Sequence, residues 1–228
     1  LKGFDMRKER GFSLAEIVVT LMIIGVIAAM TLPSLRQTAE EREKVAQVKK
    51  AYSILTQATE RAEQDNGPIK TWDSSKLNEI YKPYFNIAQE CPPGKGCFTE
   101  GNRLYPNNTK DTNYDVSGIL LADGISIKIN SGLGSKESYG ISPDDITNAK
   151  GMFYVDINGP KPRNKWGEDV FLFVLVKDKG VLPSGYYDES KCITTYGCAA
   201  YVLREGKLQN YKDKPKKPDE GSGQDDKN

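Results

Sequence analysis

Histidine is absent from the 228-residue sequence. This absence removes Ser–His–Asp triads, HExxH zinc sites and imidazole acid–base catalysis in one step. The serine and cysteine side chains therefore lack the base that activates a hydrolase nucleophile. We expect a protein that is not an enzyme.

The sequence also has almost no excess of charge of either sign. Its 32 basic and 31 acidic residues leave a formal net charge of +1, which argues against a nucleic-acid-binding surface. The glycines at Gly132–Lys136 lack the spacing of a phosphate-binding loop. We expect no nucleic-acid partner.

Cysteine is scarce, and its four copies form two close pairs: Cys91 with Cys97, and Cys192 with Cys198. Five residues separate the members of each pair, which is too wide for the CxxC elements of zinc ribbons. Four cysteines allow three disulfide connectivities, of which local pairing is the simplest. Each local bridge would stabilise the fold by about 2–3 kcal/mol.

Charged residues are almost missing from one long stretch near the N-terminus. Between positions 12 and 35 the only charged side chain is Glu16, and the run Ile17–Leu32 is almost wholly apolar. A bilayer core requires about 20 apolar residues, so we predict a transmembrane helix over residues 12–35. The basic flank at Arg7–Arg10 should stay in the cytoplasm, which places the rest of the chain outside it.

The stretch begins with Gly-Phe-Ser-Leu-Ala-Glu at Gly11–Glu16, after the basic flank and before the apolar run. This combination resembles the type III signal sequence of type IV pilins and type II secretion pseudopilins. The resemblance implies that residues 1–11 are a leader and that prepilin peptidase cuts between Gly11 and Phe12. It also implies methylation of the new N-terminal Phe12. Leu1 and Met6 both remain open as the true start.

Two more residues acquire roles from the resemblance. In the family, the carboxylate matching Glu16 is held to meet the N-terminal ammonium of a neighbouring subunit in the filament core. Opposite charges attract strongly at low dielectric, and either one alone is heavily penalised. A carboxylate that reaches the membrane surface is the alternative for Glu16. Pro33 falls where many of these proteins carry a helix-kinking proline.

Past Pro33 the apolar pattern becomes one-sided. Apolar residues recur every three or four positions through Val45–Ala58, which predicts the amphipathic half of a long helix over residues 36–66. Asn66-Gly67-Pro68 should end it. Residues 67–211 then form a globular domain, and the fold class is α+β, with the helix packed on an antiparallel sheet. The tail at 212–228 should be disordered.

Five segments of the domain carry secondary-structure signals. Ile119–Ile129 predicts a β-hairpin around a type I′ Asp-Gly turn. Met152–Ile157 and Val170–Val176 predict strands, the second more deeply buried. We expect a short helix over Ser74–Tyr81, and a last hairpin over Ala199–Leu208 with its turn at a Glu-Gly pair.

The segment between the two predicted strands is rich in side-chain oxygens. Calcium prefers several carboxylate and carbonyl oxygens, and Asp-x-Asn-Gly resembles the start of a calcium loop. The EF-hand spacing is incomplete, because Gly167 stands where the twelfth-position glutamate belongs. The alternative is an Asx turn that bonds its own backbone. The candidate calcium ligands are Asp156, Asn158, Asn164 and Asp169, with Glu168 beside them.

These features predict a pilin-like subunit of a type IV pilus or a type II secretion pseudopilus. Its partners are prepilin peptidase, the inner membrane, and other copies of itself or other pilins. The precursor should cross the inner membrane once, with its domain outside the cytoplasm, before assembly into a periplasmic or cell-surface filament. A minor pilin with an adhesin or DNA-uptake role, and a monomeric membrane-anchored binding protein, remain as alternatives.

Overall fold

The computed structural model describes residues 13–92, 96–98, 104–106, 108–110, 117–132, 139–162 and 164–208, with only the backbone described for 30–38. The predicted leader, Phe12 and the predicted tail at 212–228 lie outside these residues. The chain divides into two compact units, Leu1–Glu40 and Glu41–Asn228. Each unit is described by itself below.

Helix α1 covers Leu14–Asn66. It ends where the sequence predicts, because Gly67 adopts a left-handed conformation (φ +79°) and Pro68 follows. Pro33 lies within the helix, and a kink at this proline stays a prediction. The helix also contains the boundary between the two units.

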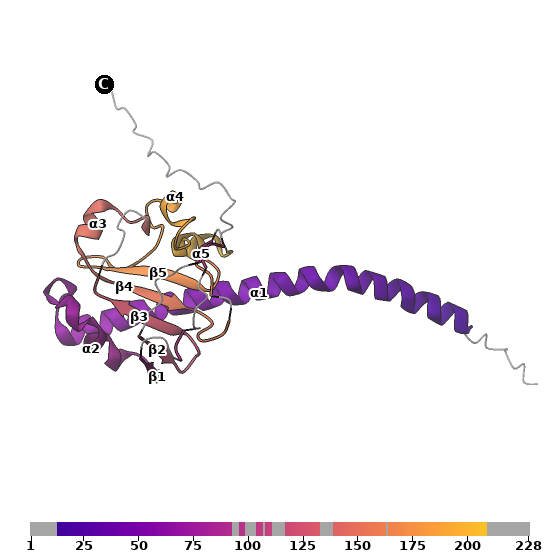
Figure 1. Cartoon of the computed structure of the whole chain (residues 1–228), viewed down its shortest axis with the longest axis horizontal. Helices are drawn as coiled ribbons and strands as arrows, with labels where there is room; N and C mark the ends of the chain where they lie inside the picture. Colours follow the sequence, from indigo (N-terminus) through magenta and orange to yellow (C-terminus); the bar gives the residue numbers. More distant parts are fainter. Residues whose placement is uncertain are drawn as a thin grey trace, which may run out of the picture. The chain divides into compact units, whose positions relative to one another are not determined.

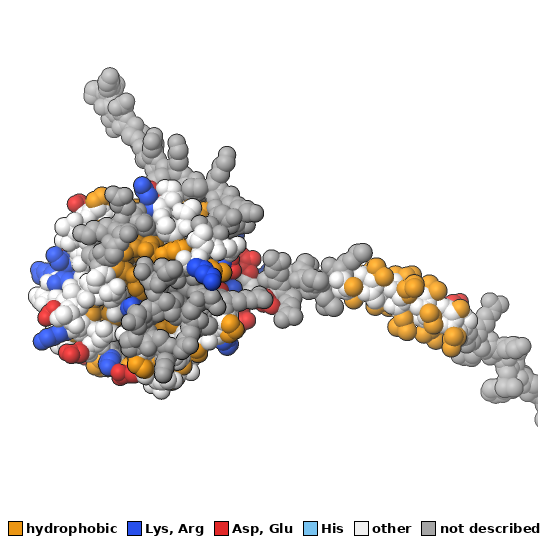
Figure 2. All heavy atoms as spheres, viewed as in Figure 1, with side chains coloured by type: hydrophobic (Ala, Val, Ile, Leu, Met, Phe, Trp, Pro, Cys, Tyr) orange, Lys and Arg blue, Asp and Glu red, His pale blue; other side chains and the backbone are white. Residues whose placement is uncertain are grey.

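The described part of the first unit has an apolar surface, which Figure 2 shows in orange. Leu14 is 83% exposed, and nine more large apolar side chains are exposed after it: Ile17, Val18, Val19, Leu21, Met22, Ile23, Ile24, Val26 and Ile27. Among the described residues, no helix is both long enough and apolar enough to cross a membrane. The transmembrane helix predicted for residues 12–35 is therefore not confirmed.

The second unit is built on one six-stranded antiparallel sheet with the strand order β1-β2-β3-β4-β5-β6 (Figure 1). Each strand pairs with its neighbour in sequence, so the sheet is a meander. The strands are β1 (Ile87–Cys91), β2 (Gly118–Leu121), β3 (Ser126–Asn130), β4 (Ala149–Asp156), β5 (Val170–Val176) and β6 (Gly180–Pro183). The predicted strands at β4 and β5 and the hairpin of β2 and β3 are confirmed, as is the α+β fold class.

One face of the sheet packs against α1 (Figure 1). The helix contributes a buried stripe at the predicted spacing: Val45, Val48, Ala51, Leu55, Ala58 and Ala62. From the sheet, alternate residues of β4 and β5 join the same core, among them Phe153, Phe171 and Phe173. Tyr52 of the helix stacks on Phe173 with ring centroids 5.8 Å apart.

The opposite face of the sheet is covered as well. The other alternate residues of β5, such as Leu172 and Val174, pack with Trp166 and with Ile146 of helix α3 (Pro143–Thr147). Every residue of β5 is therefore buried. Coverage of both faces explains why its sequence is continuously apolar instead of alternating.

Short helices connect α1 to the sheet: η1 (Ile69–Thr71), η2 (Ser74–Lys76), α2 (Leu77–Tyr81) and η3 (Lys82–Tyr84). The short helix predicted over Ser74–Tyr81 is confirmed, as a 3-10 turn followed by an α-helical turn. Tyr81 lies at the centre of this region. Its ring makes edge contacts with Trp72 and Phe153, and its hydroxyl lies 2.7 Å from Thr59 Oγ1 of α1.

The turn between β2 and β3 differs from the predicted type I′ turn. A type I′ turn requires positive φ at both central residues, whereas only Gly124 has it here (φ +87°) and Asp123 does not. Leu121 pairs with Ile125 across a three-residue loop. The Asp123 carboxylate accepts a bond from the Ile125 amide (3.3 Å) and pairs with Lys50 of α1 at 2.9 Å, which favours this longer loop.

The hairpin predicted over Ala199–Leu208 is wrong, because Ala199–Glu205 forms helix α5. Seven residues are too few for apolar spacing to separate a strand from a helix. Ser184, which follows β6, caps the helix: its Oγ accepts from the Ala199 amide at 3.0 Å, and its carbonyl accepts from Ala200 at 2.9 Å. Gly206 ends the helix in a left-handed conformation.

Both local disulfides form, Cys91–Cys97 and Cys192–Cys198, and the described residues include no free cysteine. The first holds Phe98 over β2, where it packs near Leu120. The second joins helix α4 (Glu189–Cys192) to the start of α5. Arg204 of α5 adds an ion pair with the buried carboxylate of Glu189.

The Thr59–Tyr81 bond gives the first prediction. Tyr81→Phe should lower the free energy of unfolding by about 1 kcal/mol at neutral pH, because it leaves a buried Thr59 oxygen with one bond fewer. Burial raises the pKa of Tyr81 above its usual value of about 10. The folded state then keeps a proton that the unfolded chain releases, so the stability from Tyr81 is lost as the pH rises above about 10.

Chemical denaturation at neutral and alkaline pH measures both effects. The difference in the free energy of unfolding between the original protein and Tyr81→Phe should become smaller as the pH rises above about 10, the usual pKa of tyrosine. Tyr84→Phe is the control, because Tyr84 bonds Asp65 at the surface and its loss should change stability by less than about 0.5 kcal/mol. An equal loss in both variants would contradict the buried bond.

Candidate functional site

The first turn of α1 holds a reciprocal pair of hydrogen bonds between Ser13 and Glu16. The Ser13 amide donates to Glu16 Oε2 at 2.8 Å, and the Glu16 amide donates to Ser13 Oγ at 3.2 Å. This arrangement is a capping box, which satisfies two amides that an α-helix otherwise leaves without partners. It fixes the Glu16 carboxylate at the helix N-terminus, where the helix dipole favours a negative charge.

Glu16 is the only ionisable side chain among residues 13–29. Its neighbours Leu14 and Ile17 are exposed and apolar. The site therefore presents a single carboxylate at the end of an apolar cylinder. Gly11 and Phe12, the predicted processing residues, lie outside the described residues.

Ser13 is a partner of Glu16 that the sequence analysis did not identify. The signal was present, because Ser-x-x-Glu before an apolar run is the sequence pattern of a capping box. The resemblance to a prepilin peptidase signal already explained these residues, so it did not indicate a hydrogen-bonding role for Ser13.

The predicted calcium ligands are only partly brought together. Asp156 ends β4, and its Oδ1 accepts a bond from the Asn158 amide at 3.2 Å, which is the Asx turn of the alternative interpretation. The Asn158 side chain donates to Asp169 Oδ1 at 3.3 Å. The Asn164 side chain is buried, and its Oδ1 has no hydrogen-bond partner in the described part of the chain.

Asp169 forms an ion pair with a lysine of α1. Lys44 Nζ of α1 lies 2.8 Å from Asp169 Oδ1, and the Asp169 side chain is only 5% exposed. Burial raises the pKa of Asp169, and Lys44 counteracts part of that rise. Glu168 pairs with Lys165 instead (2.6 Å). Among the described residues, no group of three or more His, Cys, Asp or Glu side chains could hold a metal ion.

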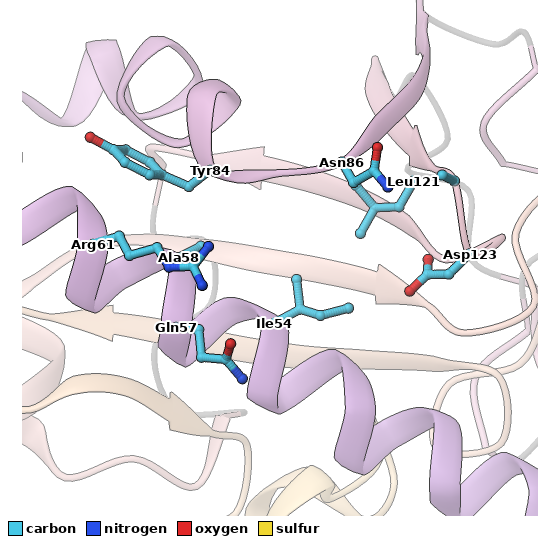
Figure 3. Close-up of a pocket in the computed structure, with 9 residues that line it drawn as sticks. Ile54, Gln57, Ala58, Arg61, Tyr84, Asn86, Leu121 and Asp123 are labelled. Carbon is cyan, nitrogen blue, oxygen red and sulfur yellow. The ribbon is translucent and has the colours of Figure 1, made fainter.

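A small hollow of about 210 Å³ lies between α1 and the β2–β3 turn (Figure 3). Ile54, Gln57 and Arg61 line it from the helix, and Tyr84 and Asn86 line it from the chain before β1. Ligand pockets usually have about 300–1,000 Å³, so this hollow suits a single side chain better than a substrate. Its lining contains no nucleophile beside a base.

Comparison with known proteins gave one match. The family model for the prokaryotic N-terminal methylation motif matches residues 6–32. The chain therefore carries the N-terminal signal of type IV pilins and pseudopilins, which confirms the resemblance of Gly11–Glu16. Searches of curated proteins and of solved structures found no match.

The Lys44–Asp169 pair gives the second prediction. Lys44→Met keeps much of the aliphatic stem but leaves the buried carboxylate without its ammonium. A broken buried pair is strongly destabilising, and the one-third exposure of Lys44 reduces the expected loss to about 1–2 kcal/mol. The loss should shrink in acid, because protonated Asp169 no longer needs a cation. Urea denaturation between neutral and acidic pH measures it.

Lys50→Met is the matched control, because it removes an ion pair of the same helix with the more exposed Asp123. It should cost less than about 1 kcal/mol. Thermal denaturation of the protein with calcium and with a chelator tests whether calcium binds to the folded state. A rise in Tm with calcium that Asp169→Asn abolishes would support the calcium prediction against the ion pair.

Proposed function

We propose that the protein is a pilin-like structural subunit. Its precursor enters the inner membrane, prepilin peptidase removes residues 1–11, and the mature chain assembles into a type IV pilus or a secretion pseudopilus. The methylation motif over residues 6–32 is the observation that carries this proposal. The domain over residues 67–211 is the part that the filament would display.

The apolar surface of the first unit supports assembly. Its large side chains are exposed on successive positions of the helix from Leu14 to Ile27. A helix that is apolar all round is stable only when lipid or other protein covers it. Before assembly the membrane provides that cover, and in a filament the same segments of other copies provide it. One repeated heterologous contact of this kind generates an open helical filament.

Glu16 supplies the specific contact in this proposal. When neighbouring helices exclude water, the carboxylate needs a positive partner. Cleavage before Phe12 creates an ammonium group on every subunit, and pairing it with Glu16 of a neighbour removes both isolated charges. Each pairing also requires a particular axial offset between the two helices.

A structural role agrees with the rest of the chain. Without histidine there is no imidazole base, and the described hollow is lined by no pair of groups suited to nucleophilic catalysis. A membrane-anchored binding protein is the second candidate. It is favoured by Arg61 in that hollow, for which the described residues provide no ion-pair partner.

The mature N-terminus gives the third prediction. Mass spectrometry of the protein from cells with an active prepilin peptidase should show a chain that begins at Phe12 and carries one N-methyl group. In cells without the peptidase, the leader should remain. An intact leader in both strains, or a cut beyond Met30, would contradict the pilin route and favour the anchored binding protein.

Filament incorporation gives the fourth prediction. Glu16→Gln keeps the size of the side chain and one oxygen that can accept the Ser13 amide but removes the charge, and it should abolish recovery of the protein in sheared filaments. Processing of the leader and both disulfides should be unaffected. Glu79→Gln, which removes an exposed charge from the domain, should leave filament recovery unchanged. Normal assembly of Glu16→Gln would refute the charge pairing.

A further inference from the structure

We propose that Ser13 is a positioning residue for Glu16, and that it holds the carboxylate ready for the ammonium of the next subunit. This inference rests on the proposed function and adds a second residue to its assembly contact. It comes from the reciprocal bonds between Ser13 and Glu16, at 2.8 and 3.2 Å.

The two bonds use only one of the two carboxylate oxygens. Oε2 of Glu16 accepts the Ser13 amide, while Oε1 has no hydrogen-bond or ion-pair partner among the described residues. A carboxylate can accept several bonds, so Oε1 stays available to an incoming ammonium. Ser13 thus fixes the orientation of the side chain without occupying Oε1.

Removal of the leader would take away no atom of this arrangement. Neither bond involves residues 1–11, and after a cut before Phe12 the Ser13 amide becomes the first peptide N–H of the mature chain. That amide and the Glu16 amide belong to the first turn, where an α-helix lacks internal acceptors. In lipid or a filament core, water cannot replace those acceptors, so the capping box matters more there than at a wet surface.

Loss of the hydroxyl has two consequences at once. Without Ser13 Oγ the Glu16 amide loses its acceptor among the described residues, and without that bond the carboxylate regains its rotamers. Fixing a long side chain again at assembly then costs conformational entropy. Leu14 and Ile17 cannot compensate, because neither has a polar atom in its side chain.

Four full-length variants test the proposal in cells that process and assemble the original protein. Ser13→Ala should reduce the ratio of assembled to processed subunit by about fivefold, the factor expected for loss of one N-cap. Ser13→Thr restores the hydroxyl and should return this ratio close to the original value. Thr20→Ala removes a hydroxyl that bonds only Ile17 O in the same helix, and should leave the ratio unchanged.

The fourth variant is Glu16→Gln, which sets the lowest assembled-to-processed ratio that the assay can show. Because Ser13 only positions the charge of Glu16, the ratio of Ser13→Ala should lie between that of Glu16→Gln and that of the original protein. Dividing by the processed pool removes any effect of position 13 on the peptidase. An unchanged ratio in Ser13→Ala, or a Ser13→Thr ratio as low as that of Ser13→Ala, would overturn the positioning role.

The two proposals fail in different ways. If Glu16→Gln blocks assembly while Ser13→Ala does not, the role of Ser13 is wrong and the pilin function stands. If the protein is never processed, or Glu16→Gln assembles normally, the proposed function itself is wrong.

Discussion

The packing of the α1 stripe on the sheet is the contact on which the second unit depends. Ala51, Ala58 and Ala62 of that stripe are small, and Val48 and Leu55 belong to the same buried core as the phenylalanines of β4 and β5. Protein interiors are close-packed, so the helix and the central strands specify each other's side chains. Trp166 and helix α3 cover the opposite face of the same sheet, so both faces of its central strands are buried.

Apolar packing has no direction of its own, and polar contacts define the register. Along α1, Lys44 binds Asp169, Tyr52 donates to the Val181 carbonyl at 3.3 Å, and Thr59 bonds Tyr81. These partners come from the loop before β5, from β6 and from α2. Each contact lies at one position along the helix, so a shift by one turn would break all of them together.

Sequence patterns correctly predicted those elements whose structure is determined by their own residues. β5 is a continuous apolar run rich in β-branched and aromatic residues, the amphipathic part of α1 is long and periodic, and Asn66-Gly67-Pro68 ends the helix by local chemistry alone. Segments determined by distant partners could not be found this way. The Ala199–Glu205 helix depends on Ser184, and the ion pair of Asp169 depends on Lys44, which only the folded chain brings to it. Calcium binding at Asp169 stays a prediction.

In the proposed filament, one carboxylate in an apolar helix would solve a problem that the apolar surface creates. Leu, Ile and Val side chains of the first unit gain nearly the same free energy at many axial offsets, since burial depends on area. A single charge that requires a single partner makes one offset much better than the others. A second charge in the same segment would allow alternative pairings, so the absence of other ionisable groups from residues 13–29 is as informative as the presence of Glu16.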